Sequence, residues 1–224
     1  MQTIGVIGAG QMGSGIAQTI AQHGLKVLLT DRELAIAEES RAGIERALGK
    51  LVSRDKIAPA EAEAALGRIT AVGDVAPMAD AAMIIEAATE KEEIKQAIFE
   101  SAGKVLADDA ILASNTSSIP ITRMANWSPD PGRFIGLHFF NPVPVMGLIE
   151  VIPGLATNKD VTDRTIEFAH LLGKEVVLSQ DEPGFVVNRI LISTLAATSA
   201  SITRWARFNW PISWDWTPAS TSCG

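Results

Sequence analysis

Residues 3–31 read TIGVIGAGQMGSGIAQTIAQHGLKVLLTD, and this stretch decides the fold. Its first apolar run ends in a glycine-rich turn, GAGQMG, at residues 8–13. Apolar residues then recur every three or four positions, which is the spacing of an amphipathic helix. A second apolar run, residues 27–29, leads directly to Asp31. The stretch therefore predicts a strand, a glycine turn, a helix and a second strand that ends beside an acidic residue.

Each glycine of the turn has a physical role in holding a dinucleotide. Gly8 permits a sharp turn, Gly10 lets the backbone approach a pyrophosphate, and Gly13 lets the helix pack closely. Asp31 is placed to accept hydrogen bonds from the adenosine ribose, which favours NAD, while Arg32 beside it leaves NADP open. The alternative is an ordinary strand-to-helix turn with flexible glycines. We predict an NAD site lined by Gly8, Gly10, Gln11, Met12, Gly13 and Asp31.

Composition excludes several classes of protein. The 224 residues carry a net charge of −7, and 47% of them are hydrophobic, which is ample for a core. An acidic chain without a basic face is not expected to bind nucleic acid. No apolar run reaches the length of a membrane span, and the single cysteine, Cys223, offers neither a disulfide nor a metal site. A strand begins almost at the first residue, so we expect no signal peptide and a soluble, cytoplasmic protein.

Strand-like and helix-like segments alternate through most of the chain. Short apolar runs predict further strands at residues 69–72, 83–87, 111–114, 134–139, 148–152 and 175–178. Amphipathic spacing predicts helices at residues 34–52, 59–66, 92–106 and 160–172. This alternation predicts an α/β fold with a doubly wound, mostly parallel sheet of the Rossmann type over residues 1–182.

A histidine and a glutamate stand out at the ends of two predicted strands. In a doubly wound sheet the chemistry collects beyond the carboxyl ends of the strands, and His138 lies at such an end. The sequence NPVP allows a hairpin-like return that brings Glu150 beside the imidazole. A carboxylate there would fix the tautomer of the ring and raise its basicity. The alternatives are a core histidine and an acid at the sheet edge.

Four motifs together resemble one enzyme family: GAGQMGSGIA, SNTSSIPIT, GLHFFNPVPVMGLIEVI and DEPGFVVNRIL. Over about residues 1–192 the chain is similar to the L-3-hydroxyacyl-CoA dehydrogenase family, and within it to the bacterial 3-hydroxybutyryl-CoA dehydrogenases. The resemblance implies oxidation of an L-3-hydroxyacyl-CoA by NAD, or the reverse reaction, with an acyl-CoA substrate. It also implies the homodimer of the family, although we expect the domain that forms this dimer to be largely missing. Two alternatives stay open: a catalytically dead NAD-binding fragment, and a related NAD-dependent hydroxy-acid dehydrogenase.

The resemblance also implies roles for individual residues. The residues that match catalytic positions of the family are His138, Glu150, Ser117 and Asn188. Those that match positions at the cofactor are Glu90, Lys95, Ser117 and Asn141, and those that match substrate contacts are Ser117, Asn188 and Arg54. Ala47 stands where some members have a serine that contacts CoA. The alternative for Ser117, Ser118 and Asn188 is helix capping or surface polarity.

The chain departs from the family pattern near its end. Family members continue into a helical second domain, whereas we expect only its beginning at residues 183–195 and an aberrant tail at 196–224. Four of the five tryptophans fall between Trp205 and Trp216, and Trp has a single codon. One permitted choice of codons for residues 203–224, read two nucleotides later, encodes PMGPIQLADLMGLDTCLDILR. That string resembles the second-domain motif PMGPxxLADxxGLD, so we expect the tail to be out of frame; the alternative is a genuine divergent tail.

Overall fold

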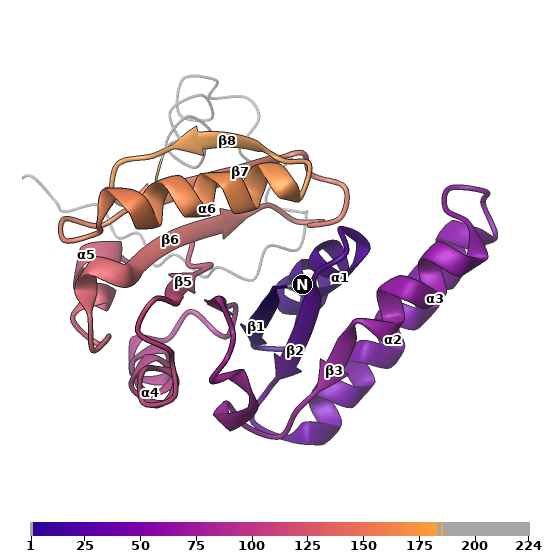
Figure 1. Cartoon of the computed structure of the whole chain (residues 1–224), viewed down its shortest axis with the longest axis horizontal. Helices are drawn as coiled ribbons and strands as arrows, with labels where there is room; N and C mark the ends of the chain where they lie inside the picture. Colours follow the sequence, from indigo (N-terminus) through magenta and orange to yellow (C-terminus); the bar gives the residue numbers. More distant parts are fainter. Residues whose placement is uncertain (1, 183–184, 186–224) are drawn as a thin grey trace, which may run out of the picture. The chain divides into compact units, whose positions relative to one another are not determined.

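An eight-stranded sheet forms the centre of the chain (Figure 1). The computed structural model describes residues 2–182 and residue 185. The strands lie in the order β3-β2-β1-β4-β5-β6-β7-β8, and within the described residues only β6 and β7 run antiparallel. Their bounds are β1 Thr3–Ile7, β2 Lys26–Thr30, β3 Ile69–Ala71, β4 Met83–Glu86, β5 Ile111–Ser114, β6 Phe134–Phe139, β7 Leu148–Pro153 and β8 Glu175–Leu178. The predicted doubly wound, mostly parallel sheet is confirmed.

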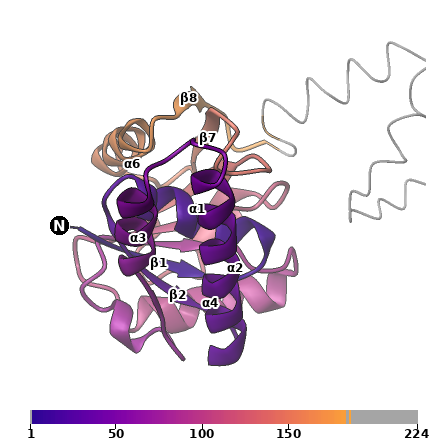
Figure 2. The same cartoon turned by 90° about the vertical axis from the view of Figure 1, so that its right-hand side faces the viewer.

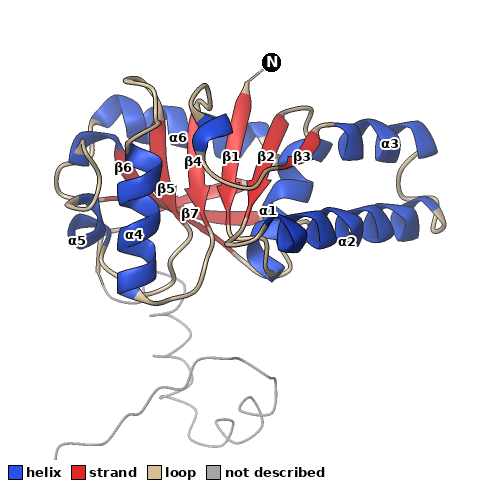
Figure 3. Cartoon of the chain, turned by 90° about the horizontal axis from the view of Figure 1, so that it is seen from below, coloured by secondary structure: helices blue, strands red, loops and turns tan. Residues whose placement is uncertain are grey.

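Helices cover both faces of this sheet (Figure 3). Their bounds are α1 Gln11–Gln22, α2 Leu34–Val52, α3 Pro59–Gly67, α4 Glu92–Gly103, α5 Ile121–Ala125 and α6 Lys159–Leu171, with short 3-10 turns at Ala76–Met78 and Pro131–Arg133. The helix expected at 92–106 ends three residues early, at Gly103. The long α2 and α3 project from the β3 edge as an antiparallel arm, which faces the viewer in Figure 2.

Two separate hydrophobic cores follow from the alternation of side chains along each strand. Ile85 of β4 and Ala113 of β5 point into one core, which contains α1, α2, α3 and α6. Ile84 and Leu112, one residue earlier in each strand, point into the other, which contains α4 and α5. Because both faces are covered, the central strands read as continuous apolar runs rather than as alternating ones.

The order of the strands reverses at β1, which has β2 on one side and β4 on the other. The chain leaves the sheet on opposite sides after β1 and β4, so a crevice opens at the carboxyl ends of these two strands. Ligands of doubly wound proteins bind at this position. The glycine turn follows β1, and the segment that carries Glu90 follows β4, so both border the crevice.

Candidate active site

The glycine turn has the space that a pyrophosphate needs. Gly8 has a φ of +101°, and a side chain there would collide with the carbonyl oxygen of Ala87 at 2.6 Å. At Gly13 a Cβ would lie 1.7 Å from the carbonyl oxygen of Gly8, so only glycine permits this packing of α1. At Gly10 nothing lies within 4 Å of an added Cβ. Gly8 and Gly13 therefore shape the turn, and Gly10 leaves open space over the start of α1.

The start of α1 is able to receive an anion. Gly10 is the N-cap and supplies no side chain, and the first turn contains no acidic residue. The first backbone N–H groups of a helix have no partner within it, and they carry the positive end of the helix dipole. Gln11 and Met12, which the sequence analysis assigned to the glycine turn, belong to the first turn of α1. An open glycine above an uncapped helix end fits the diphosphate of a dinucleotide.

Asp31 at the end of β2 is already oriented toward this turn. Its Oδ2 accepts a hydrogen bond from the backbone N–H of Ala9 at 2.6 Å, and its Oδ1 accepts one from Arg32 at 2.8 Å. A carboxylate has about four acceptor positions, so two remain for the hydroxyls of a ribose. The carboxylate therefore borders the glycine turn and keeps acceptor positions that a ribose could use.

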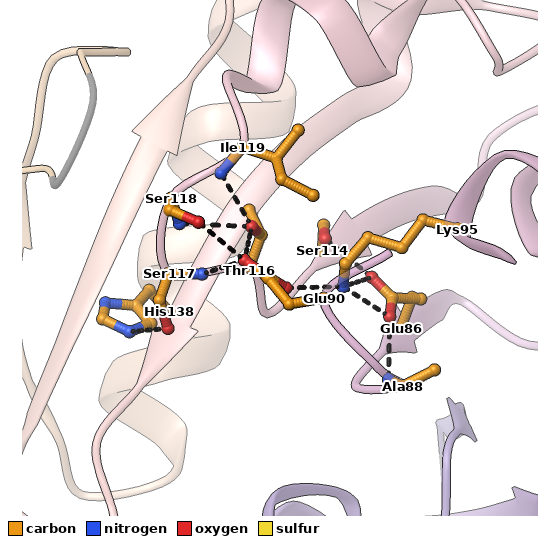
Figure 4. A network of polar contacts seen from close by, with 10 residues as sticks. All are labelled: Glu86, Ala88, Glu90, Lys95, Ser114, Thr116, Ser117, Ser118, Ile119 and His138. Atoms are coloured by element: carbon orange, nitrogen blue, oxygen red, sulfur yellow. Dashed lines mark hydrogen bonds and ion pairs between the residues drawn. The ribbon is translucent and has the colours of Figure 1, made fainter. Parts of the chain in front are cut away.

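A buried ion pair lies beneath the next part of the crevice (Figure 4). Glu86, at the end of β4, has no exposed surface. Both of its carboxylate oxygens accept hydrogen bonds from the ammonium of Lys95, at 2.7 and 2.8 Å. The hydroxyl of Ser114 and the backbone N–H of Ala88 donate to the same carboxylate, each at 2.7 Å. Lys95 is itself only 1% exposed and also lies 3.2 Å from Glu90. One buried lysine therefore connects two carboxylates.

Glu90 carries this network to the loop that follows β5. Its Oε1 accepts three hydrogen bonds: from the hydroxyl of Thr116, the backbone N–H of Ser117 at 3.0 Å and the hydroxyl of Ser118 at 3.2 Å. Burial by itself would raise the pKa of Glu90, but the charge of Lys95 and these hydrogen bonds outweigh burial, so the pKa lies below its ordinary value. The ionised carboxylate holds the loop in place.

His138 is held from both ring nitrogens. The antiparallel pairing of β6 and β7 sets it directly opposite Glu150, and its Nδ1 lies 2.7 Å from the Oε2 of that carboxylate. Both side chains are buried. The hydroxyl of Ser117 lies 3.2 Å from Nε2. Because an ionised carboxylate only accepts, Nδ1 donates its proton to Glu150, and Nε2 is the ring nitrogen that faces Ser117.

Two aromatic rings border the imidazole of His138, and the sequence analysis predicted no role for either of them. The ring centroid of Phe140 lies 4.7 Å from that of His138, and the ring centroid of Phe185 lies 5.8 Å from it. Phe185 is 1% exposed. Apolar walls of this kind keep water away from an acid–base group and strengthen its electrostatic contacts. Phe140 belongs to the motif HFFNP and Phe185 to the motif PGF, so these two motifs could have indicated the rings.

The remaining predicted residues are distributed as follows. Asn141 is exposed at the start of the turn after β6, close in sequence to His138. Arg54 is exposed in the turn between α2 and α3. This turn lies at the outer end of the projecting arm, far from β6, the strand that carries His138 (Figure 3). Asn188 lies outside the described residues. Ser117 and Ser118 do not cap α5, whose first two amides donate instead to Asp181.

Neither a metal site nor a membrane-spanning helix is found among residues 2–182 and 185. Among them, no group of three or more His, Cys, Asp or Glu side chains is arranged to hold a metal ion. No helix in the same part of the chain is both long enough and apolar enough to cross a membrane.

Known proteins of one family match most of this chain. Residues 3–182 match the family described as 3-hydroxyacyl-CoA dehydrogenase, NAD binding domain. A probable 3-hydroxybutyryl-CoA dehydrogenase of Deinococcus radiodurans is 46% identical over 191 residues, which cover 85% of this chain and 68% of the relative. A 3-hydroxybutyryl-CoA dehydrogenase of Mycobacterium tuberculosis is 44% identical over 197 residues, which cover 87% of this chain and 69% of that protein.

A solved structure gives the same result. The crystal structure of (S)-3-hydroxybutyryl-CoA dehydrogenase from Ralstonia eutropha superposes with a TM-score of 0.87 at 37% identity, covering 92% of this chain and 73% of that one. The family match over residues 3–182 includes the glycine turn and the strands that carry His138 and Glu150. The chain therefore belongs to the 3-hydroxyacyl-CoA dehydrogenase family, an NAD-dependent family of oxidoreductases, and residues 3–182 are its NAD-binding domain.

Proposed function

We propose that this chain interconverts an L-3-hydroxyacyl-CoA and the corresponding 3-oxoacyl-CoA, with 3-hydroxybutyryl-CoA as the substrate tested first. The observation that carries the proposal is the His138 site. Its Nδ1 contacts Glu150 at 2.7 Å, its Nε2 contacts Ser117 at 3.2 Å, and it lies at the carboxyl edge of an NAD-binding sheet. The similarity to named 3-hydroxybutyryl-CoA dehydrogenases supports the choice of substrate.

In the proposed reaction, bound NAD supplies the acceptor for the hydride that leaves C3 of the substrate. His138 removes the proton of the 3-hydroxyl group with Nε2, and the ring becomes an imidazolium. Glu150 stabilises that positive charge and keeps the ring in its orientation. Ser117 supports the substrate oxygen on the same side. In the reverse direction the imidazolium returns the proton to the 3-oxo oxygen.

Asn188 and Arg54 complete the proposal for the substrate. Asn188 is proposed to hold the 3-oxygen together with Ser117, and Arg54 is proposed to attract the phosphates of CoA by its charge. At the cofactor, Asn141, Glu90 and Lys95 are proposed to border the nicotinamide. Lys95 does so from the interior, by holding the carboxylate of Glu90, since it is buried between Glu86 and Glu90.

The experiment is oxidation of NADH by the purified chain with acetoacetyl-CoA. We expect His138→Ala to lower the rate by about 10²–10⁴, the usual contribution of a positioned acid–base group. His170→Ala is the matched control, because this second histidine is exposed at the end of α6. Near-normal turnover by His138→Ala would refute the role of this histidine.

Two other outcomes separate the alternatives. A folded chain that binds NADH but turns over no acyl-CoA would be a cofactor-binding fragment without catalysis. Turnover of a free hydroxy acid in preference to its CoA ester would indicate a related hydroxy-acid dehydrogenase. We propose residues 1–182 as the NAD-binding unit and residues 183–195 as the start of a helical region; the second range lies almost wholly outside the described residues.

A further inference from the structure

Lys174 is a buried lysine for which no carboxylate among the described residues forms an ion pair. It lies just before β8, with 7% of its surface exposed. Its Nζ donates to the backbone carbonyl oxygens of Val143 at 2.8 Å and Met146 at 2.7 Å. Burial lowers the pKa of Lys174. A buried ammonium is costly unless its donors are satisfied, so its two carbonyl partners are what stabilise it in this position.

Both carbonyls belong to one segment, residues 140–147, which we name the β6–β7 turn. The neighbour of Lys174, Glu175, donates its backbone N–H to the carbonyl of Gly147 at 2.7 Å. Two consecutive residues therefore hold three carbonyls of the β6–β7 turn. Only the lysine does so through a side chain, which makes it the part of this contact that a substitution can remove.

The other side of the β6–β7 turn lies against α1, the helix whose start faces the cofactor. Val143 is 2% exposed and belongs to the same core as α1. An added Cβ at Gly15 would lie 2.9 Å from the Cβ of Val143 and 3.1 Å from its Cγ2. Gly15 is the fourth glycine of GAGQMGSG, and none of the three dinucleotide roles requires it. Its role here is to let the β6–β7 turn approach α1.

The β6–β7 turn begins with the groups that border the site. The ring of Phe140 contacts that of His138 at 4.7 Å, and Asn141 follows directly. We propose that Lys174 is a positioning residue that, with Gly15, seats the β6–β7 turn on α1 and thereby sets the affinity for the nicotinamide cofactor. The role of Asn141 at the cofactor rests on the proposed function. The affinity for NADH is measured without turnover, so it tests the present proposal separately from that function.

The first test is titration of the full chain with NADH, followed by nicotinamide fluorescence. Lys174→Met keeps an unbranched apolar side chain as far as Cε and removes the ammonium that donates both hydrogen bonds. We expect the Kd for NADH to rise roughly tenfold, because two backbone carbonyls lose their partner and the β6–β7 turn shifts. A Kd equal to that of the wild-type chain would overturn the proposal.

Arg133→Met is the matched control. Arg133 also bridges two backbone carbonyls from one nitrogen, those of Ala107 at 2.7 Å and Ala110 at 3.3 Å. Those residues precede β5 and so lie at the amino end of the sheet, away from the cofactor. We expect this variant to lose stability while its Kd for NADH stays within roughly twofold of wild type. Equal weakening in both variants would mean general destabilisation and would overturn the proposal.

A second pair of variants decides the question if Lys174→Met does not fold. Gly15→Ala is expected to weaken NADH binding, and adding Val143→Gly is expected to restore part of it, because the clashing isopropyl group is then gone. Unchanged binding in the single variant, or no restoration in the double variant, would overturn the proposal. Turnover of acetoacetyl-CoA by the wild-type chain reports separately: its absence refutes the proposed function and leaves the NADH result intact.

Discussion

At the scale of single residues, Glu86 is the clearest case of a charge retained inside the fold. Its carboxylate has no exposed surface and accepts hydrogen bonds from Lys95, Ser114 and Ala88. An ion pair of this kind rarely adds much net stability over an apolar pair, yet removing one partner leaves the other charge uncompensated. Its function here is to hold Lys95, and through it Glu90, under the loop that carries Ser117.

We therefore predict that Glu86→Gln lowers the free energy of unfolding by about 3 kcal/mol. Among the described residues, Lys95 would keep Glu90 as its one ionic partner, at 3.2 Å. Denaturant unfolding of the wild-type and variant chains measures the change. The double variant Glu86→Gln/Lys95→Met removes both charges and is expected to recover part of the loss. A single variant within about 0.5 kcal/mol of wild type would contradict the argument.

The sequence allowed only part of these residue contacts to be predicted. The pairing of His138 with Glu150 was predictable because a short turn between two apolar runs forces neighbouring strands together. The contacts of Glu86 with Ser114 and of Lys174 with the β6–β7 turn were not, because these partners lie about thirty positions away in the sequence. Glu86 did leave a signal, as the one charged residue in the apolar run MIIEA. A buried lysine that bonds only backbone carbonyls leaves no pattern of residue types at all.

At the scale of elements, the short helix α5 depends on a residue about sixty positions away. Its first two amides, those of Ile121 and Thr122, donate to the two oxygens of Asp181 at 2.6 and 2.7 Å. The preceding residue, Pro120, has no side chain that can cap the helix. Asp181 is the first residue of the motif DEPGF, so this motif supports the helix that follows the Ser117 loop.

Asp181→Ala is expected to destabilise the chain by about 1–2 kcal/mol, the usual effect of losing a helix cap. The loss should be local, so hydrogen exchange of the amides of α5 should accelerate more than that of the central strands. Asp163→Ala is the control, since Asp163 pairs with Lys159 on an exposed surface and contributes little. Unchanged exchange in α5 of the Asp181 variant would refute the cap.

Most elements were predictable because their patterns are local. The strands at 111–114, 134–139 and 175–178 and the helix at 34–52 have the expected bounds. The ends were predicted less well where no cap signals them: α4 ends at Gly103, although apolar residues continue to Leu106. The 3-10 turns at 76–78 and 131–133 are too short to show any period.

At the scale of the whole molecule, one prediction concerns the reading frame that encodes the tail. The tail, residues 196–224, lies outside the described residues, and we propose that it is encoded out of frame. Sequencing the natural transcript around codons 195–203 is expected to reveal a shift that restores PMGPIQLADLMGLD. The contradicting result is a natural protein whose C-terminal tryptic peptide begins at Phe208 and carries the printed tail.

The single antiparallel pair in the sheet also has a consequence for how the molecule folds. His138 and Glu150 are twelve residues apart and meet across a hairpin, whereas the dinucleotide crevice needs parallel strands joined by whole helices. Hairpins close in about 1–10 μs, and parallel pairing is slower because longer chain segments must be ordered first. The pair that we propose for proton transfer is thus a local structure, and we expect its hairpin to form before the parallel strands close the cofactor crevice beside it.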